Sequence, residues 1–171
     1  MSVPLATGRS WHLRLALVRA LIGIFPSFTL NRTRLWALRA CGIRIGSSTL
    51  FWGLPVLKGR GGSLASRLAI GSFCGLNEGC EFDLSAPVTI GNHVSVGHEV
   101  RFITTVTREG AQTAAPITIG DGAWLGARCT IMGGVTIGAG SVIGAGMTIT
   151  QDVEPNMLVN GAKPISLARW G

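Results

Sequence analysis

The sequence has little charge and no tyrosine. Only 13% of its 171 residues are charged, whereas 47% are hydrophobic. This balance excludes an intrinsically disordered chain, because so much apolar surface favours burial in a core. Arginine interrupts the apolar stretches within a few residues, so no segment is expected to span a membrane. The length is that of one ordinary domain.

Acidic residues are missing from the first third of the chain. Residues 1–50 hold seven arginines and no Asp or Glu, whereas the rest holds eight basic and eight acidic residues. The net charge of +7 therefore arises in the N-terminal third. A nucleic-acid-binding domain usually presents basic residues within a recognisable motif or among aromatics. No such motif is present, so we expect no nucleic-acid partner.

The N-terminal third predicts one or two α-helices. Residues 11–25 form a nearly apolar segment with two arginines, and Ser10 precedes it as a suitable N-cap. This helix either packs on protein or lies on an anionic membrane surface, where arginines favour binding. A second helix over residues 32–40 fits between Asn31 as its N-cap and Gly42 as its C-terminal stop.

Hydrophobic residues recur with a period of six through the rest of the chain. Helices would need a period of 3.6 and half-buried strands a period of two, so neither explains the pattern. Three hexapeptides can form one triangular coil, with the aliphatic side chains inside and glycine at crowded corners. The periodic positions are Ile70, Leu76, Phe82, Ile90, Val96, Phe102, Ile119, Leu125, Ile131, Ile137, Ile143 and Ile149.

The period breaks at two places. The step from Phe82 to Ile90 is eight residues, and the step from Phe102 to Ile119 is 17. The second break means that the loop 104–116 must leave the coil. Loops that leave a rigid scaffold often carry function.

The four cysteines form no Cys-x-x-Cys motif, so neither a common zinc motif nor a disulfide framework is predicted. Cys74, Cys80 and Cys129 each follow a periodic residue by four places, where small or apolar residues recur. We therefore predict that these three are buried core thiols.

This pattern resembles the left-handed parallel β-helix of hexapeptide-repeat proteins. Residues 117–160 resemble the last coils of hexapeptide-repeat O-acetyltransferases that act on galactosides, maltose or bacterial polysaccharides. The resemblance implies an all-β fold: a left-handed β-helix domain over 43–171, containing the loop 104–116, after a basic helical preamble over 1–42. It also implies a homotrimer that transfers acetyl from acetyl-CoA to a sugar hydroxyl of a cell-surface polysaccharide or its precursor. The expected location is the bacterial cytoplasm, peripheral to the inner membrane.

The resemblance also implies roles for particular residues. Asn77 helps hold the acceptor, and Trp124 flanks the CoA groove. Gly126 and Ala127 let the pantetheine arm approach the backbone. The remaining implied CoA contacts are Ala145, Thr150 and Lys163.

The catalytic base departs from the family pattern. The family places a histidine in the projecting loop, at a position that falls on Thr107 or Arg108 here, and residues 104–116 contain no histidine. Arginine stays protonated and cannot act as a general base. His98 and His93 lie in the preceding coil, and we assign catalysis to His98 because it is nearer the loop. The alternative is a non-catalytic or scaffold subunit.

The spacing of His93 and His98 also resembles the γ-class carbonic anhydrases, which share this prism. These enzymes bind zinc between subunits through two such histidines and a third one upstream. A catalytic zinc site needs three protein ligands and a water. Residues 43–92 contain no histidine, so we favour the acetyltransferase and predict no metal.

Overall fold

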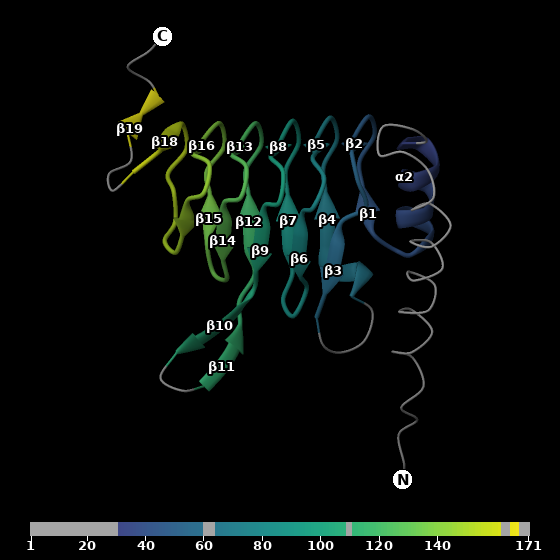
Figure 1. Ribbon diagram of the computed structural model, residues 1–171, viewed down its shortest axis with the longest axis horizontal. Helices are drawn as coiled ribbons and strands as arrows, with labels where there is room; N and C mark the ends of the chain where they lie inside the picture. The colour runs from purple at the N-terminus through teal and green to yellow at the C-terminus, as the bar shows by residue number, and fades with distance from the viewer. Residues whose placement is uncertain (1–30, 60–63, 109–110, 162–164, 168–171) are drawn as a thin grey trace.

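The computed structural model describes residues 31–59, 64–108, 111–161 and 165–167. Helix α2 (Asn31–Ala40) precedes a stack of short parallel strands that form the three sides of a prism (Figure 1). The fold is a left-handed parallel β-helix behind an N-terminal helix, as the resemblance to hexapeptide-repeat proteins implied. Among the described residues, no helix has both the length and the apolar character to cross a bilayer.

Each side of the prism is one sheet. Sheet 1 contains β1 (Arg44–Ile45), β4 (Leu68–Ile70), β7 (Val88–Ile90), β12 (Ile117–Ile119) and β15 (Thr136–Ile137). Sheet 2 contains β2 (Leu50–Phe51), β5 (Gly75–Leu76), β8 (Ser95–Val96), β13 (Trp124–Leu125), β16 (Val142–Ile143), β18 (Met157–Val159) and the antiparallel β19 (Ile165–Ser166). Sheet 3 contains β3 (Val56–Lys58), β6 (Glu81–Asp83), β9 (Arg101–Ile103), β14 (Thr130–Met132) and β17 (Thr148–Ile149).

The periodic residues stack in register inside the prism. In sheet 1, for example, Ile90 pairs with Ile70 on one side and Ile119 on the other. Phe82 and Phe102 stack in the interior with ring centroids 4.6 Å apart, and both are fully buried. The periodic residues thus point into a continuous apolar core.

Tight turns at two corners require left-handed backbone. Each of these turns has two residues, and the second one has a positive φ in successive coils. At many of these positions the second residue is not glycine. Between sheets 1 and 2 the non-glycine examples are Ser48, Phe73, His93 and Asn156. Between sheets 2 and 3 they are Glu99 and Arg128, with φ of 56° and 59°.

Helix α2 confirms the helix predicted over residues 32–40 and packs on the first coil. Leu35 and Leu38 join the core of the prism. Asn31 links the helix to that coil, because its carboxamide oxygen accepts a hydrogen bond from the Phe51 N–H at 2.9 Å. The helix predicted over residues 11–25 lies outside the described residues.

The loop predicted to leave the prism forms a β-hairpin. Strands β10 (Thr105–Arg108) and β11 (Ala111–Ala114) pair antiparallel and project away from the coils (Figure 1). A short 3-10 helix, η1 (Ala65–Arg67), precedes β4. The side chain of Arg67 donates hydrogen bonds to the carbonyls of Leu84 and Ser85, at the first break of the period.

Candidate active site at a corner of the prism

The turns between sheets 2 and 3 form one ladder, which we call the His98 corner. It consists of residues 77–79, 97–99, 126–128 and 144–146 in four successive coils. The backbone N–H of Arg128 donates to the His98 carbonyl at 2.8 Å, and the N–H of Gly146 donates to the Ala127 carbonyl at 2.8 Å. Since neighbouring strands lie about 4.8 Å apart, His98, Ala127 and Ala145 follow one another along this corner.

His98 begins its turn and is exposed to solvent. The next residue, Glu99, accepts a hydrogen bond from the Arg128 Nε at 2.8 Å. Both partners of this ion pair are more than half exposed, so it stabilises the fold little and is screened by salt. The imidazole therefore stands beside a surface ion pair, open to a ligand from solvent.

In the two coils that follow His98, most residues of this corner are glycine or alanine. A Cβ added to Gly126 would meet the Ala145 nitrogen at 2.5 Å, so close coil stacking alone explains this glycine. Ala127 is half-buried, Ala145 is exposed, and a Cβ at Gly146 would meet nothing within 4 Å. The result is an open strip on which an extended chain could lie against the backbone.

Trp124 borders this strip from the outer face of sheet 2. It lies in β13, two residues before Gly126, and is 60% exposed. Its strand neighbours are the small residues Ser95 and Val142. An indole this exposed leaves a flat apolar face available to a ligand or to another chain.

Asn77 lies in the same ladder, one coil before Gly97. Its amide Nδ2 donates to the Val96 carbonyl at 3.0 Å, and its side chain is half-buried. The contact fixes the side chain within the turn, so this asparagine supports coil pairing. A role in holding an acceptor stays a prediction.

Thr150 lies away from the His98 corner. It follows β17 and, with Thr105, Thr107 and Met132, lines a shallow depression of about 360 Å³ at the base of the hairpin. This base is at the opposite edge of sheet 3 from His98, across the width of β9. Lys163 lies outside the described residues.

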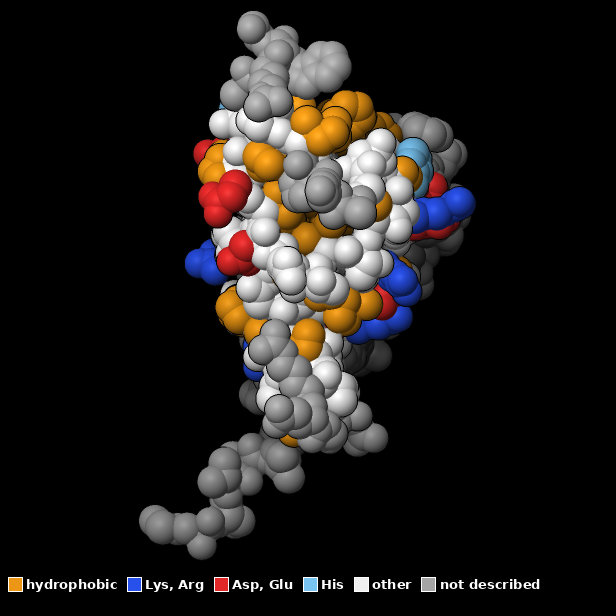
Figure 2. All heavy atoms as spheres, turned by 90° about the vertical axis from the view of Figure 1, so that its left-hand side faces the viewer, with side chains coloured by type: hydrophobic (Ala, Val, Ile, Leu, Met, Phe, Trp, Pro, Cys, Tyr) orange, Lys and Arg blue, Asp and Glu red, His pale blue; other side chains and the backbone are white. Residues whose placement is uncertain are grey.

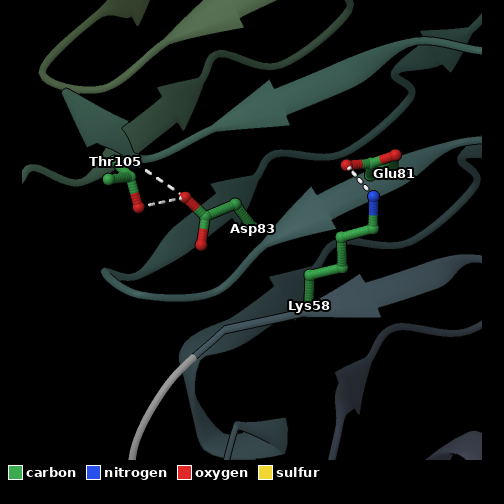
Figure 3. A network of polar contacts seen from close by, with 4 residues as sticks. All are labelled: Lys58, Glu81, Asp83 and Thr105. Carbon is green, nitrogen blue, oxygen red and sulfur yellow. Dashed lines mark hydrogen bonds and ion pairs between the residues drawn. The ribbon is translucent and has the colours of Figure 1, made fainter.

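Asp83 fixes the hairpin to the prism (Figure 3). Its Oδ2 accepts hydrogen bonds from the Thr105 N–H at 2.8 Å and the Thr105 hydroxyl at 2.6 Å. Its Oδ1 accepts two more from the Ser85 N–H and hydroxyl. Burial alone would raise the pKa of Asp83, but these hydrogen bonds outweigh it and lower the pKa to about 2. Nothing in the period of six or in the quoted motifs marks this residue.

His93 is at the other edge of sheet 2 from His98. It lies in a turn between sheets 1 and 2 and stacks on Phe73, with ring centroids 5.0 Å apart. Within the described ranges, no three His, Cys, Asp or Glu side chains come together to hold a metal. The two histidines therefore flank β8 without a third ligand from that part of the chain.

The cysteines are core residues, as predicted. Cys74, Cys80 and Cys129 are buried free thiols. Burial raises the pKa of Cys80 to about 11 and, with a further contribution from Cys80, that of Cys129 to about 12. Thiols with such pKa values are poor nucleophiles at neutral pH.

Known proteins match the repeat region and the fold. A sequence model described as the hexapeptide repeat of succinyl-transferase matches residues 116–151. A protein of Schizosaccharomyces pombe, provisionally named an acetyltransferase, is 42% identical over 98 residues, covering 52% of this chain and 47% of its own length. Chloramphenicol acetyltransferase of Agrobacterium fabrum is 34% identical over 110 residues, covering 57% of this chain and 49% of its own. The chain thus spans about half the length of the curated relatives it matches.

A solved structure extends the likeness over nearly the whole chain. The hexapeptide-repeat-containing acetyltransferase of Vibrio cholerae superposes with a TM-score of 0.74 at 28% identity, covering 95% of this chain and 94% of that one. The Vibrio protein has also been solved in complex with acetyl-coenzyme A. These findings confirm the resemblance to hexapeptide-repeat acetyltransferases that the period of six and residues 117–160 indicated.

Proposed function

We propose that this protein is an acetyl-CoA-dependent O-acetyltransferase. Its acceptor is a sugar hydroxyl of a cell-surface polysaccharide or its precursor, and it works in the bacterial cytoplasm, peripheral to the inner membrane. The observation that carries the proposal is the His98 corner, where an exposed histidine precedes an open strip of small residues next to Trp124. The acetyltransferase names among its relatives support the same activity.

The strip is suited to a long, thin substrate arm. Ala127 and Ala145 present methyl groups, and the exposed indole of Trp124 provides an apolar wall. We assign the pantetheine arm of acetyl-CoA to this strip. Thr150 stays a proposed CoA contact, which a second copy of the chain would supply because this residue lies away from the His98 corner. Lys163 stays a proposed contact of the CoA phosphates, and Asn77 a proposed contact of the acceptor.

His98 is the proposed general base. The acceptor oxygen attacks the thioester carbonyl while the imidazole takes the hydroxyl proton. A C–O bond forms, the C–S bond breaks, and the proton is then given to the departing CoA thiolate. Such acid–base assistance accelerates transfer by about 10²–10⁴-fold. An exposed imidazole can perform it, because one ring nitrogen of a neutral histidine accepts a proton.

The proposed assembly is a homotrimer with sites between copies. Within one chain, His98 and the hairpin base are at opposite edges of sheet 3. A site that uses both the corner and the hairpin therefore requires a second copy of the chain. An isolated two-stranded hairpin is also only marginally stable in water, which favours its coverage by a neighbouring copy.

One observation favours a second candidate, a non-catalytic scaffold subunit. Residues 104–116 contain no histidine, so the loop lacks the acid–base group that the family places there. Such a subunit would keep the corner and the trimer but would not turn over acetyl-CoA.

Thiol release from acetyl-CoA tests the proposal. We expect release that depends on a glycan from a panel of surface oligosaccharides, with chloramphenicol as the small-molecule comparison because of the Agrobacterium relative. Release with chloramphenicol but no glycan would overturn the polysaccharide acceptor. Calorimetric CoA binding without transfer to any acceptor would favour the scaffold subunit.

A further inference from the structure

The outer face of α2 presents two arginines and a tryptophan. Arg32, Trp36 and Arg39 are spaced four and three residues apart, so they share one stripe of the helix. All three are exposed, Trp36 at 73%. The other side of the helix packs on the first coil through Leu35 and Leu38. The stripe therefore faces solvent at the N-terminal end of the prism (Figure 1).

A groove runs between this stripe and the turn before β2. Its volume is about 510 Å³, and it is lined by Trp36, Leu50 and the stripe arginines, with the hydroxyl-bearing turn residues 47–49. Leu50 is 46% exposed. Large apolar side chains and cations thus lie together along this groove: Arg32, Trp36, Arg39 and Leu50. We call these residues, with the exposed Arg44 of β1, which contacts α2 through its strand, the α2 face.

Positive charge on the α2 face has no acidic neighbour in sequence. The first acidic residue of the chain is Glu78. Arg32 and the exposed Arg44 of β1 take part in no ion pair among the described residues. At the opposite end of the prism, basic and acidic side chains occur together along the flank (Figure 2). Among the described residues, the α2 end therefore carries positive charge without acidic neighbours.

Arg39 makes this surface rigid. Its guanidinium donates three hydrogen bonds, two to the Ile45 carbonyl and one to the Gly46 carbonyl, at 2.7–3.1 Å. The helix is thereby fixed to the start of the coil at the same edge as Arg44. A preformed surface binds without an ordering cost.

We propose that the α2 face binds an anionic lipid bilayer. Arginines near such a surface are attracted to its phosphates, and tryptophan favours the headgroup region, where its ring is half in apolar surroundings. Trp36 and Leu50 distinguish this surface from a purely basic patch, because they offer apolar area that a soluble polyanion would leave in water. The inference depends on neither acetyl transfer nor residues 11–25.

Vesicle co-sedimentation of the full chain tests this proposal. We expect binding to vesicles containing phosphatidylglycerol, little binding to pure phosphatidylcholine, and weakening at high salt. Each arginine contributes about fivefold in affinity, so Arg32→Gln/Arg44→Gln should bind roughly 25-fold more weakly. Trp36→Ala should lose roughly tenfold through its apolar area.

The matched control is Arg101→Gln/Arg128→Gln, which lowers the net charge equally at exposed sites outside the α2 face. It should bind vesicles like the parent. If both double variants lose binding to the same extent, the attraction is non-specific and the proposal is wrong. If both bind like the parent, the preceding residues carry the binding and the proposal is also wrong.

Two further measurements complete the test. A single-stranded oligonucleotide that binds the α2 face while vesicles do not would overturn the lipid assignment in favour of a soluble polyanion. Acetyl transfer to a soluble acceptor should be unchanged in Trp36→Ala. Failure of vesicle binding is thereby separated from failure of the proposed enzyme activity.

Discussion

His98 and His93 provide a comparison between two exposed turn histidines. His98 is at the corner with the open strip, and His93 is at the other edge of the same sheet. We expect His98→Asn to lower acetyl transfer by about 10²-fold or more with little change in CoA affinity, because only proton transfer is lost. The initial rate of thiol release and calorimetry measure these two quantities.

His93→Asn is the matched control for this prediction. It alters an exposed histidine in the same coil, and the parent rate should be retained. A His98→Asn variant that transfers acetyl at the parent rate would remove His98 from catalysis. Equal losses of acetyl-transfer rate in both variants would point to a shared structural effect on the coil that contains β8, and not to proton transfer by His98.

Gly97 shows how closely the coils approach at the His98 corner. A Cβ at this position would meet the Ala127 nitrogen at 2.5 Å. Gly97→Ala should therefore reduce the free energy of unfolding by roughly 1–3 kcal/mol, the usual cost of overpacking. Ser95→Ala, at an exposed position in the adjacent strand, should leave it nearly unchanged. Denaturant unfolding compares the two variants. Equal free energies of unfolding would show that the two coils can move apart at Gly97 without destabilising the fold.

Sequence reasoning predicted more about residue positions than about residue contacts. The period placed His98 in the coil before the loop and the three cysteines in the core. It did not reveal the hydrogen bonds of Asp83, although the Asp83-x-Ser85 spacing is typical of a side-chain-to-backbone turn. The bonds to Thr105 could not be predicted, because the period gives no information on how the insertion re-enters the coil.

At the scale of elements, the small-residue strip can be tested by filling it. Ala145→Trp should abolish CoA binding and leave the oligomeric state unchanged, because a large ring would occupy the space above the backbone. Ala139→Trp is the control, since Ala139 is an exposed turn alanine of the same coil at a different corner. If calorimetry shows equal CoA affinity for the two variants, CoA does not bind along the strip at Ala145.

The hairpin should respond to acid through Asp83. Its pKa is lowered from 3.8 to about 2 in the folded protein. A depressed carboxyl pKa stabilises the fold above the unfolded pKa, and this contribution is lost as pH falls from about 4 to 2. We expect the protection of the β10 amides, taken relative to the intrinsic exchange rate at each pH, to fall over this range, and Asp83→Asn should show low protection at every pH.

Asp121→Asn is the matched control for the hairpin. Hydrogen bonds from Asn92 lower the pKa of Asp121 too, but this carboxyl is exposed and remote from β10. The control should keep the acid response of the hairpin. If the protection of the β10 amides changes neither with pH nor in Asp83→Asn, strand pairing alone holds the hairpin.

The strands of the β-helix could be predicted from the sequence where the six-residue repeat is regular. The first coil lies within the predicted domain over 43–171, but its strands were not identified, although Ile45, Phe51 and Leu57 keep the step of six and stack on the next coil. Its signal is short and is followed by an insertion, so the regular period was found only from Ile70 onward. The strands of the hairpin were also missed, because residues 105–114 lack the alternating apolar pattern of a half-buried strand.

At the scale of the whole molecule, the buried thiols report on opening of the prism. Cys80 and Cys129 lie two coils apart, and burial raises their pKa values to about 11 and about 12. Labelling by a thiol reagent at neutral pH should therefore require unfolding. We expect both sites to label at the global unfolding rate. Much faster labelling of Cys80 would show that the N-terminal coils open separately.

The two ends of the prism have a consequence for self-association. Parallel coils leave unpaired backbone groups on their first and last strands, and such edges can template the addition of another chain. Here α2 lies over the first coil, and β19 pairs antiparallel with β18 at the far end. Sheet 2 is thereby covered at both of its ends, which opposes end-to-end polymerisation through that sheet. A chain without β19 would expose the edge of β18, and we would expect it to grow into filaments that scatter light.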